Sequence, residues 1–591
     1  MKYSDRLAEW LMELGYTHCF FVAGGNIMHL LESVSRRLDC RPVINEVAAG
    51  IAAEYFNETG GSRALALVTA GPGLTNIITA MAGAYLESRE LLVIGGQVKT
   101  ADLSRGRLRQ RGIQEIDGVA IARPVSVCSR LLEAPVDRAH FRELVLNGRV
   151  GRPGPVFLEI PLDVQAMQVE SETRDTVGGG REASGAEDPR QASPEVLSKV
   201  TALLHRAARP VILLGGGVRR AVALDLGEAF ARAGVPVATT WNGADRIGAD
   251  HPVYAGRPNT WGQRSANLIL QQADVVLALG TRLGMQQTGF NWQQFVPGGS
   301  VIQVEIDPAE LAKGHPVVEH PVCADANDFL QRLMREDLGQ HPAWLAYARR
   351  LRAELPPAEP ANRTAEGHLS PHLFIERLSS LCSREDVIIP CSSGGAFTVM
   401  MQVFAQKAGQ YMVTNKGLAS MGYGLAGAIG AAIANPHRRV VLVEGDGGFA
   451  QNLQEIGTAR ANGLNLKIFI FDDGGYASIR MTQRNYFQGR YVGCDRATGL
   501  GLPDWARLFA AWDVPVMALP DPASLQGEFV EAFARPGLMA FVVKLDPEQT
   551  YYPKIASRIS ASGAMESNPL HLMSPELDEA TMRAVGRFLP Y

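Results

Sequence analysis

The sequence predicts an α/β protein made of three doubly wound parallel-sheet domains. Short apolar runs alternate with stretches of helical periodicity along the chain, and several of these runs end in Gly or Asp. Two polar stretches that are rich in glycine or proline interrupt the pattern. The chain has 591 residues, which is more than one hydrophobic core usually supports. Together these observations indicate several α/β units in one chain.

The apolar runs are the expected strands. They are short and almost continuous in apolar residues, which is typical of strands buried on both faces of a parallel sheet. Ligands of such sheets bind at the carboxyl ends of the strands, so function should reside at those ends. The expected strands cover residues 64–70, 91–96, 156–161, 211–217, 275–280, 301–307, 440–448 and 467–475.

The two interrupting stretches, 170–193 and 355–370, have the composition of linkers. They divide the chain into units of ordinary domain size, and we expect the C-terminal tail to pack on these units. The expected domains are 1–169, 194–340 and 371–550, followed by a tail over 551–591.

The composition argues against several classes of protein. The net charge is -4 and no stripe of Lys and Arg is visible, so we expect no nucleic-acid partner. The seven cysteines include no CxxC pair, which disfavours a disulfide framework or a zinc site. The N-terminal segment has the pattern of an amphipathic helix, not of a signal peptide, and no apolar run is long enough to span a membrane. We therefore expect a cytoplasmic enzyme without a membrane partner.

Two acidic strand ends give the most specific local signal. The run 440–448 ends in EGDGG and the run 467–475 ends in DDGG. One βαβ crossover would join these strands and place Asp446 beside Asp473 at the sheet edge. Carboxylates next to a glycine-lined turn and a helix start suit Mg²⁺ together with a phosphate group. The alternative is two ordinary turns, because Asp and Gly are common turn residues.

These motifs resemble the diphosphate-binding motif of thiamine-diphosphate-dependent enzymes, which begins with GDG and ends with an Asn pair. The resemblance implies thiamine diphosphate and Mg²⁺ as cofactors, with Asp446, Asp473 and the backbone carbonyl of Gly475 as metal ligands. The Asn pair is replaced here by Asp472 and Asp473, which adds negative charge near the diphosphate. The glycines of this motif that would bind the cofactor are Gly445, Gly447 and Gly448.

Four blocks near the N-terminus match the same family in the same order: FFVAGGNIMHLLES, PVINEVAAGIAAEYFNETGG, ALALVTAGPGLTNIITAMAGAYLES and ELLVIGGQVKT. The resemblance implies that Glu46 hydrogen-bonds the aminopyrimidine ring of the cofactor and promotes proton removal from its thiazolium C2. A carboxylate in a water-poor cleft suits this role. The alternative is an acid that only stabilises a helix N-terminus. Other implied residues are Gly25, Gly73 and Asn76 at the cofactor, and Gln97 and Gln114 at the active site.

A segment of the third domain, TNKGLASMGYGLAGAIGAA, resembles the part of the family fold that lies beneath the bent cofactor. The resemblance implies that Met421 is the wedge that keeps the two cofactor rings in a V, and that Ala419 offers its carbonyl to the aminopyrimidine. The alternative for Met421 is an ordinary core residue.

Residues 1–550 as a whole resemble acetolactate synthase large subunits. The resemblance implies a pyrimidine-binding domain, a central domain of the FAD-binding type and a diphosphate-binding domain. Related families keep the central domain without the flavin, so FAD stays one of two possibilities. The alternative for its candidate residues is a structural turn or a structural polar group. The candidate FAD-binding residues are Gly215, Gly216, Gly217, Asn267, Arg282 and Asp307.

Residues that differ from those of the synthases narrow the range of acceptors that we expect. Gln286 and Thr482 stand where those enzymes have an Arg and a Trp that favour a keto acid as acceptor, and Leu162 replaces a usual Lys. Without the Arg clamp, an uncharged or differently shaped acceptor is favoured. Segment 107–124 keeps Gln114 and Glu115 and lacks the paired histidines of simple pyruvate decarboxylases, which favours ligation over aldehyde release.

We therefore expect thiamine-diphosphate-dependent decarboxylation of a 2-keto acid, with pyruvate as the donor, and transfer of the acyl carbanion to a carbonyl acceptor. A nucleotide-linked keto sugar is one candidate acceptor. The alternatives are acetolactate synthase proper, a 2-keto acid decarboxylase or oxidase, and a noncatalytic nucleotide-binding protein. The family resemblance also implies a homodimer or homotetramer, in which the cofactor lies between subunits.

Overall fold

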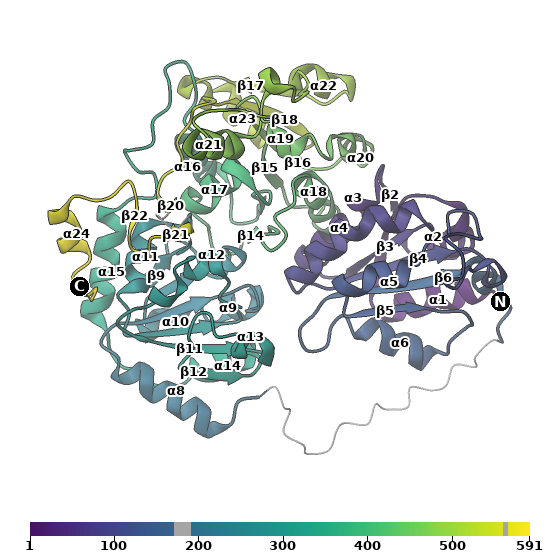
Figure 1. Cartoon of the computed structure of the whole chain (residues 1–591), viewed down its shortest axis with the longest axis horizontal. Coiled ribbons are helices and arrows are strands. Elements are labelled where there is room, and N and C mark those ends of the chain that lie inside the picture. The colour runs from purple at the N-terminus through teal and green to yellow at the C-terminus, as the bar shows by residue number, and fades with distance from the viewer. Residues whose placement is uncertain (171–190, 560–564, 591) are drawn as a thin grey trace.

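The computed structural model describes residues 1–170, 191–559 and 565–590. These residues form three six-stranded parallel sheets with flanking helices, which confirms the predicted fold class (Figure 1). The predicted linker over 170–193 lies almost wholly outside the described residues, and the exact limits of the domains stay predictions. Each of the eight runs expected as strands contains a strand. The other strands were not predicted, including Tyr16–Phe21 and Met539–Lys544, which have six residues each.

The first sheet has the strand order β2-β1-β3-β4-β6-β5. Its strands are β1 (Tyr16–Phe21), β2 (Asp39–Pro42), β3 (Arg63–Val68), β4 (Leu91–Gln97), β5 (Cys128–Leu131) and β6 (Pro155–Pro161). The helices of this part are α1 (Tyr3–Glu13), α2 (Met28–Ser35), α3 (Glu46–Thr59), α4 (Pro72–Leu86), α5 (Gly118–Ala122), α6 (Arg138–Leu146) and α7 (Leu162–Ala166).

The second sheet has the strand order β12-β11-β10-β7-β8-β9. Its strands are β7 (Pro210–Leu214), β8 (Val237–Thr239), β9 (Tyr254–Gly256), β10 (Val275–Leu279), β11 (Ser300–Glu305) and β12 (His320–Cys323). The helices of this part are α8 (Pro194–Arg206), α9 (Arg220–Asp225), α10 (Gly227–Ala233), α11 (Arg264–Gln271), α12 (Met285–Thr288), α13 (Pro308–Ala312), α14 (Ala326–Leu333) and α15 (Pro342–Glu354).

The third sheet has the strand order β14-β13-β15-β16-β18-β17. Its strands are β13 (Val387–Ile389), β14 (Tyr411–Met412), β15 (Val440–Gly445), β16 (Leu466–Asp472), β17 (Val516–Leu519) and β18 (Met539–Lys544). The helices of this part are α16 (Pro371–Leu381), α17 (Gly394–Val403), α18 (Tyr423–Ala434), α19 (Asp446–Phe449), α20 (Ile456–Ala461), α21 (Ala477–Tyr486), α22 (Trp505–Ala511) and α23 (Glu528–Ala534).

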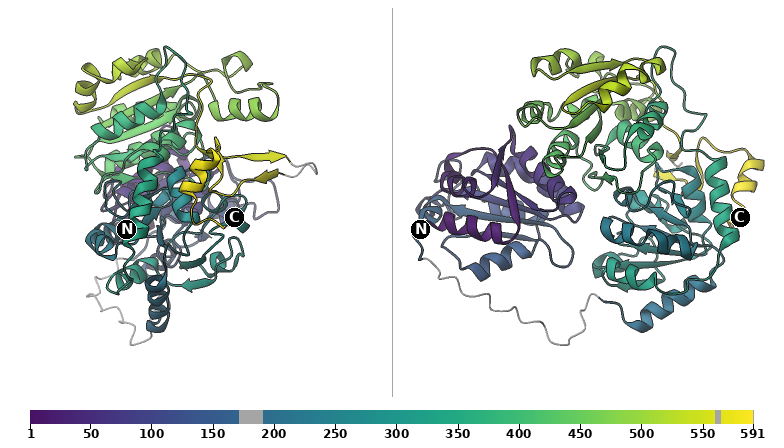
Figure 2. Two further views of the ribbon diagram at one scale, coloured as in Figure 1. Left: turned by 90° about the vertical axis from the view of Figure 1, so that its left-hand side faces the viewer. Right: turned by 180° about the vertical axis from the view of Figure 1, so that it is seen from behind.

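The C-terminal tail packs on the second domain, as expected. Asn267 Nδ2 donates to the carbonyl of Leu570 at 3.0 Å, and Arg264 Nη1 donates to the carbonyl of Met573 at 3.1 Å. A hairpin of the tail extends away from the rest of the chain (Figure 2). The elements of the tail are β19 (Lys554–Ile555), β20 (Ser557–Ile559), β21 (Met565–Ser567), β22 (Met573–Ser574) and α24 (Glu579–Val585).

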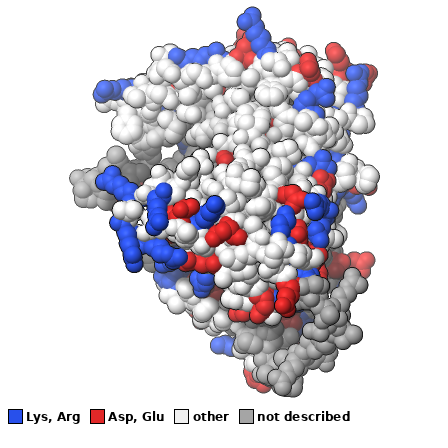
Figure 3. All heavy atoms as spheres, turned by 90° about the vertical axis from the view of Figure 1, so that its right-hand side faces the viewer, with Lys and Arg blue, Asp and Glu red and all other residues white. Residues whose placement is uncertain are grey.

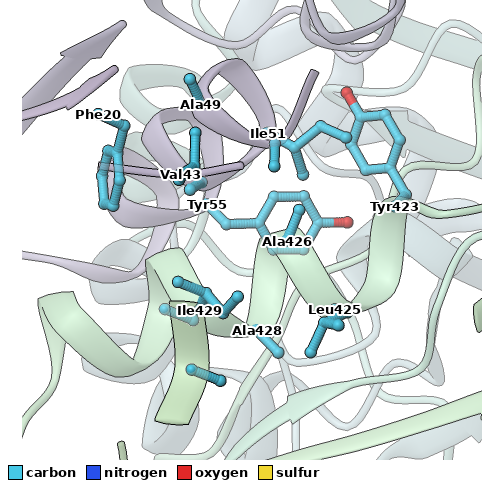
Figure 4. Packing of buried hydrophobic residues seen from close by; sticks show 14 of the residues in the cluster. Phe20, Val43, Ala49, Ile51, Tyr55, Tyr423, Leu425, Ala426, Ala428 and Ile429 are labelled. Atoms are coloured by element: carbon cyan, nitrogen blue, oxygen red, sulfur yellow. The ribbon is translucent and has the colours of Figure 1, made fainter. Parts of the chain in front are cut away.

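Helices α3 and α18 join the first and third domains through a shared apolar core (Figure 4). Small residues allow the close approach. A Cβ atom on Gly430 would lie 2.0 Å from the carbonyl oxygen of Ala52, and one on Gly427 would lie 2.6 Å from the Tyr55 ring. The two domains therefore contact each other nearly backbone to backbone along these helices.

Two arginines of ion pairs, Arg89 and Arg220, join the three domains through hydrogen bonds to backbone carbonyls of a neighbouring domain. Arg89 Nη1 donates to Glu54 Oε1 at 2.7 Å, and its Nη2 donates to the carbonyl of Thr414 in the third domain at 2.8 Å. Arg220 of the second domain pairs with Asp245 at 2.5 Å and donates to the carbonyl of Glu58 at 2.7 Å. These groups are costly to bury alone, so their pairing holds the domains in one arrangement.

The surface carries both signs of charge. On the face shown in Figure 3, Lys and Arg lie beside Asp and Glu, and a broad region between the charged parts is uncharged. Large apolar side chains are also exposed, including Ile113 at 85% and Met28 at 55%. Among the described residues, no helix is long and apolar enough to cross a membrane.

Candidate active site

Glu46 is the first residue of α3, as predicted. Asn45 precedes it in an extended conformation and caps the helix, because its side chain accepts a hydrogen bond from the backbone N–H of Val47. Glu46 is 8% exposed, and Asn76 Nδ2 of α4 donates to its Oε2 atom at 2.9 Å. The structure therefore brings two of the predicted cofactor-site residues into direct contact, and Asn76 orients the carboxylate.

The segment that carries Gln114 lies against the start of α4. Gly71 has φ +66°, and a Cβ atom there would lie 2.6 Å from the carbonyl oxygen of Gln114. Gln114 itself has φ +63°. Only glycine adopts such a turn without strain while another backbone lies this close. Gly73 follows at the first turn of α4, and Gly25 begins a short 3₁₀ turn (Gly25–Ile27) after β1.

Gln97 ends β4, but its side chain is occupied by the protein. Its Nε2 donates to the carbonyl of Ile116 at 2.9 Å and to Glu159 Oε1 at 3.0 Å. Burial, together with the charge of nearby Asp117, raises the pKa of Glu159 to about 8, so this carboxyl is mostly neutral at pH 7. Gln97 therefore fixes the segment after Gln114 to the end of β4 through its bond to the carbonyl of Ile116.

The acidic strand ends meet at the edge of the third sheet. β15 and β16 are parallel neighbours, and the backbone N–H of Gly474 donates to Asp446 Oδ2 at 2.9 Å. Asp446 is 1% exposed and Asp473 is 8% exposed. Burial and the charge of Asp473 hold the pKa of Asp446 well above its usual range, and burial raises the pKa of Asp473 to about 6. Two buried carboxylates of this kind are stabilised by a cation.

The described residues contain no cluster of three or more His, Cys, Asp or Glu side chains that could hold a metal. The side chains that could bind a metal here are therefore the two carboxylates of Asp446 and Asp473. A backbone carbonyl and phosphate oxygens would complete the ligands. This set fits Mg²⁺, which keeps few protein ligands and shares phosphate oxygens with its substrate or cofactor. Gly475 lies next to these carboxylates with φ +150°, and a Cβ atom there would lie 2.2 Å from the carbonyl oxygen of Cys494.

Each of the two aspartates that stand where the family motif has an amide pairs with a basic side chain. Arg480 Nη2 donates to Asp473 Oδ1 at 2.8 Å, and Lys544 pairs with Asp472. Arg480 is buried, and its Nε atom has no hydrogen-bond partner in the part of the chain that the structure describes. Arg480 was not predicted from the sequence. The extra negative charge was the available signal, because a buried carboxylate requires a nearby cation.

The predicted cofactor-binding segments of the third domain include one residue with an unusual backbone conformation and one closely packed glycine. Ala419 has φ +55°, which lies in the left-handed region of backbone conformation. Residues other than glycine rarely adopt this conformation. Met421 is 38% exposed, so it is not a core residue of the single chain. A Cβ atom on Gly447 would lie 2.3 Å from the Tyr476 ring, whereas one on Gly445 would contact nothing within 4 Å.

A short 3₁₀ turn, Leu453–Glu455, lies between the two halves of the predicted site. Glu455 Oε1 accepts hydrogen bonds from the backbone N–H groups of Ile44 at 3.2 Å and Asn45 at 3.0 Å. Asn452 Nδ2 donates to the carbonyl of Gly422 at 2.8 Å. In the described part of the chain, no hydrogen bond or ion pair joins Glu46 to Met421 or Asp446.

A large cavity of about 690 Å³ lies where the three domains meet. Three of the predicted FAD-binding residues, Gly216, Gly217 and Arg282, line it. Gly215 lies behind them, where a Cβ atom would be 2.2 Å from the carbonyl oxygen of Gly280.

Two other predicted FAD-binding residues make contacts within the protein. The Asn267 side chain accepts from the backbone N–H of Asn259 and donates to the carbonyls of Asn259 and of Leu570 in the tail. Asp307 caps α13 and pairs with Arg152 at 2.9 Å. Neither of them lines the large cavity.

Three regions of the chain match descriptions of known protein domains. Residues 1–121 match the thiamine pyrophosphate enzyme, N-terminal TPP binding domain, residues 197–333 match its central domain, and residues 393–543 match its C-terminal TPP binding domain. Together these matches cover most of the chain, and each contains part of one of the three sheets.

Relatives match nearly the full length. The chain is 31% identical over 565 residues to the acetolactate synthase isozyme 1 large subunit of Escherichia coli, covering 93% of this chain and 95% of that protein. It is 29% identical over 569 residues to the acetolactate synthase of Arthrospira platensis, with the same coverage. It is 28% identical over 575 residues to the isozyme 2 large subunit of Escherichia coli, covering 95% of this chain and 99% of that protein.

Proposed function

The chain belongs to the thiamine pyrophosphate (thiamine diphosphate) enzyme family and is of the acetolactate synthase type, and from this premise we propose the reaction and the roles of its residues. It decarboxylates a 2-keto acid, with pyruvate as the donor, and transfers the acyl unit to a carbonyl acceptor. The observation that carries this proposal is the buried pair Asp446 and Asp473 at a glycine-rich sheet edge, in one chain with the buried Glu46.

The residues have distinct roles in this proposal. When bound, thiamine diphosphate supplies the carbon nucleophile and the electron sink for decarboxylation. Asp446, Asp473 and the carbonyl of Gly475 hold Mg²⁺, and the glycines of the turn after β15 hold the diphosphate. The Glu46 carboxylate would hold and return a proton beside the aminopyrimidine, and Asn76 fixes the orientation of this carboxylate through their 2.9 Å hydrogen bond.

FAD is part of the proposal. The large cavity has the size of a ligand site and is lined by Gly216, Gly217 and Arg282. The side chains of Arg219 and Arg282 line it without a hydrogen-bond or ion-pair partner among the described residues, so they are available to phosphate oxygens. These features support a flavin nucleotide there. The working assembly in this proposal is a cytoplasmic homodimer or homotetramer.

The substitutions at Gln286 and Thr482 bear on the acceptor of the proposed reaction. Gln286 lines the large cavity in place of an Arg that would grip a carboxylate, and Thr482 lies on α21 with its hydroxyl bonded to the carbonyl of Ser478 at 2.9 Å. An acceptor without a carboxylate, such as a keto sugar, fits these substitutions. The full-length similarity to acetolactate synthases supports the second candidate, in which a second 2-keto acid is the acceptor.

The test is CO₂ release from pyruvate by protein supplied with thiamine diphosphate and Mg²⁺. We expect release that increases with a suitable acceptor, and a decrease of at least about 100-fold in Glu46→Gln, because a positioned acid or base contributes that much. The control is Glu228→Gln, whose side chain is 97% exposed and distant in the second domain. Equal rates for Glu46→Gln and the control would exclude the role of Glu46. Acetolactate formed from pyruvate alone would favour the second candidate.

A further inference from the structure

Glu455 is a buried carboxylate of the third domain that contacts the first domain just before Glu46. It is 0% exposed. Its Oε1 atom accepts from the backbone N–H groups of Ile44 at 3.2 Å and Asn45 at 3.0 Å, and its Oε2 atom lies 3.3 Å from the N–H of Ile44. Among the described residues, no basic side chain forms an ion pair with Glu455, so hydrogen-bond donors alone offset its burial.

The backbone that leads into α3 depends on this carboxylate. The N–H of Val43 makes the last bond to β1, at 3.0 Å, and the N–H of Val47 is bonded to the Asn45 side chain at 3.1 Å. Between them, Glu455 is the acceptor for the N–H groups of Ile44 and Asn45 in the described part of the chain. The Ile44 side chain is 51% exposed, so apolar burial does little to hold this segment.

The anchored segment is the one that sets the position of Glu46. Asn45 caps α3, and Glu46 is the first residue of that helix. Asn76 bonds to the Glu46 carboxylate at 2.9 Å from α4, while Glu455 holds the backbone on the other side of the helix start. A shift of the backbone there moves the carboxylate, and a misplacement of about 1 Å can cost about 100-fold in rate.

All the contacts of Glu455 with these groups need an acceptor. In addition to the two backbone N–H groups, the hydroxyl of Thr458 donates to Oε2 at 2.6 Å. A carboxylate has two acceptor oxygens, whereas a glutamine of the same size has one oxygen and one NH₂ group. Glu455→Gln would therefore place a donor against a donor and disturb the segment without leaving a cavity.

We propose that Glu455 is a positioning residue for Glu46: its carboxylate holds the backbone of Ile44 and Asn45 and thereby sets the Glu46 carboxylate in place for proton transfer. This inference rests on the proposed function and adds a residue of the third domain to the control of its proposed acid–base group. One segment, 446–455, then carries a proposed metal ligand at its start and the support of Glu46 at its end.

The first test compares Glu455→Gln with Glu531→Gln, whose side chain is 72% exposed in the same domain. Both proteins are supplied with thiamine diphosphate and Mg²⁺, and CO₂ release from pyruvate is measured. We expect kcat to fall about 10- to 100-fold in Glu455→Gln, while the KM for thiamine diphosphate changes less than about 3-fold. The control should match the wild type. Thr458→Val, which keeps the carboxylate but removes one of its donors, should lower kcat less, and it tests the proposal if Glu455→Gln does not fold.

Two further measurements separate positioning from a purely structural role. The double variant Glu46→Gln with Glu455→Gln should be no slower than Glu46→Gln alone, because without Glu46 there is no carboxylate to position. In the proteins without cofactor, backbone amide exchange at Ile44 and Asn45 should be about 10-fold faster in Glu455→Gln than in the wild type, and unchanged in Glu531→Gln.

Three outcomes would overturn the proposal. The first is a loss of thiamine diphosphate affinity with kcat unchanged, which would assign Glu455 to the diphosphate half of the site. The second is a further loss of rate in the double variant, and the third is unchanged amide exchange at Ile44 and Asn45. Failure of the proposed function is distinguishable, because it would remove CO₂ release from the wild type itself.

Discussion

At the residue scale, the pairing of Asp473 with Arg480 explains how the chain tolerates a carboxylate where its relatives' motif has an amide. The carboxylate is buried and its cation is bonded to both its side chain and its backbone carbonyl. The pair as a unit carries no net charge. In the proposed function, the cofactor diphosphate would therefore meet a balance of charge similar to that of the neutral amide.

The double substitution Asp473→Asn with Arg480→Gln tests this compensation. Arg480→Gln alone leaves an unbalanced carboxylate, so we expect thiamine diphosphate affinity at fixed Mg²⁺ to fall about 10-fold or more, because an unpaired buried charge is strongly unfavourable. The double variant should recover most of that loss. Arg484→Gln is the matched control, since Arg484 lies on the same helix and pairs with the exposed Glu548. Equal losses in the single and double variants would contradict compensation.

Glu159 makes stability depend on pH. Its pKa is about 8 in the folded protein, above the value of 4.5 expected when exposed. The folded state therefore binds this proton more tightly than the unfolded chain does, so this contribution to stability is full below about pH 4.5 and is lost as the pH rises through about 8.

Glu159→Gln keeps a neutral acceptor for Gln97 and cannot ionise. We expect the unfolding midpoint in urea to match that of the wild type near pH 5 and to decline less between pH 6 and 9. Glu228→Gln, with its 97% exposed side chain, serves as the control and should follow the wild type. A decline as steep in Glu159→Gln as in the wild type would assign the pH dependence to other groups.

At the element scale, the contact of α3 with α18 depends on glycine. Gly430→Ala would place a methyl group 2.0 Å from the carbonyl oxygen of Ala52, and the backbones would have to separate. We expect a loss of about 1–3 kcal/mol in the free energy of unfolding, the usual cost of overpacking. Urea unfolding followed by tryptophan fluorescence measures it.

Gly61→Ala is the matched control for that experiment, because a Cβ atom there contacts nothing within 4 Å. It should change stability by a few tenths of a kcal/mol at most. If Gly430→Ala is as stable as this control, the two helices have room to move apart, and the contact is not the rigid joint described above.

The sequence predicted the long central strands and the acidic strand ends well, because continuous apolar runs and glycine-rich ends are local signals. Short strands such as β8 and β13, of three residues each, escaped prediction because such runs carry no periodicity. Arg480 also escaped prediction. Its importance depends on its burial and on its contact with Asp473, and neither is visible in the local sequence.

The predicted site residues also differ in how well the local sequence could identify their role. Glu46 and Asn76 could be chosen from motif and helix position, and the structure places them in contact. The candidate Asn267 could not be judged from sequence. Its amide is used by the C-terminal tail, which lies some three hundred positions further along the chain.

At the scale of the whole molecule, Met421 is exposed, and among the described residues no hydrogen bond or ion pair joins Glu46 to Asp446 or Asp473. Both observations fit a cofactor site shared between subunits. Large apolar side chains such as Ile113 are exposed in the single chain and suit a subunit interface.

Mixing two inactive variants tests that arrangement. Glu46→Gln and Asp446→Asn chains are unfolded together in equal amounts and refolded. If each site combines two chains, a mixed dimer has one intact site, and random pairing should restore about a quarter of wild-type CO₂ release. Either variant refolded alone provides the baseline. If each site lies within one chain, the mixture stays at that baseline.

The buried ion pairs that join the domains also limit how such an enzyme can evolve. Arg89 and Glu54 of the first domain bond to each other, and Arg89 also donates to the carbonyl of Thr414 in the third domain. Arg220 of the second domain donates to the carbonyl of Glu58 in the first. A domain exchanged with that of a relative would bring its own charges to this junction and leave others unpaired. Recombination between such genes should therefore succeed only when these residues are inherited as one set, so the three domains diverge together.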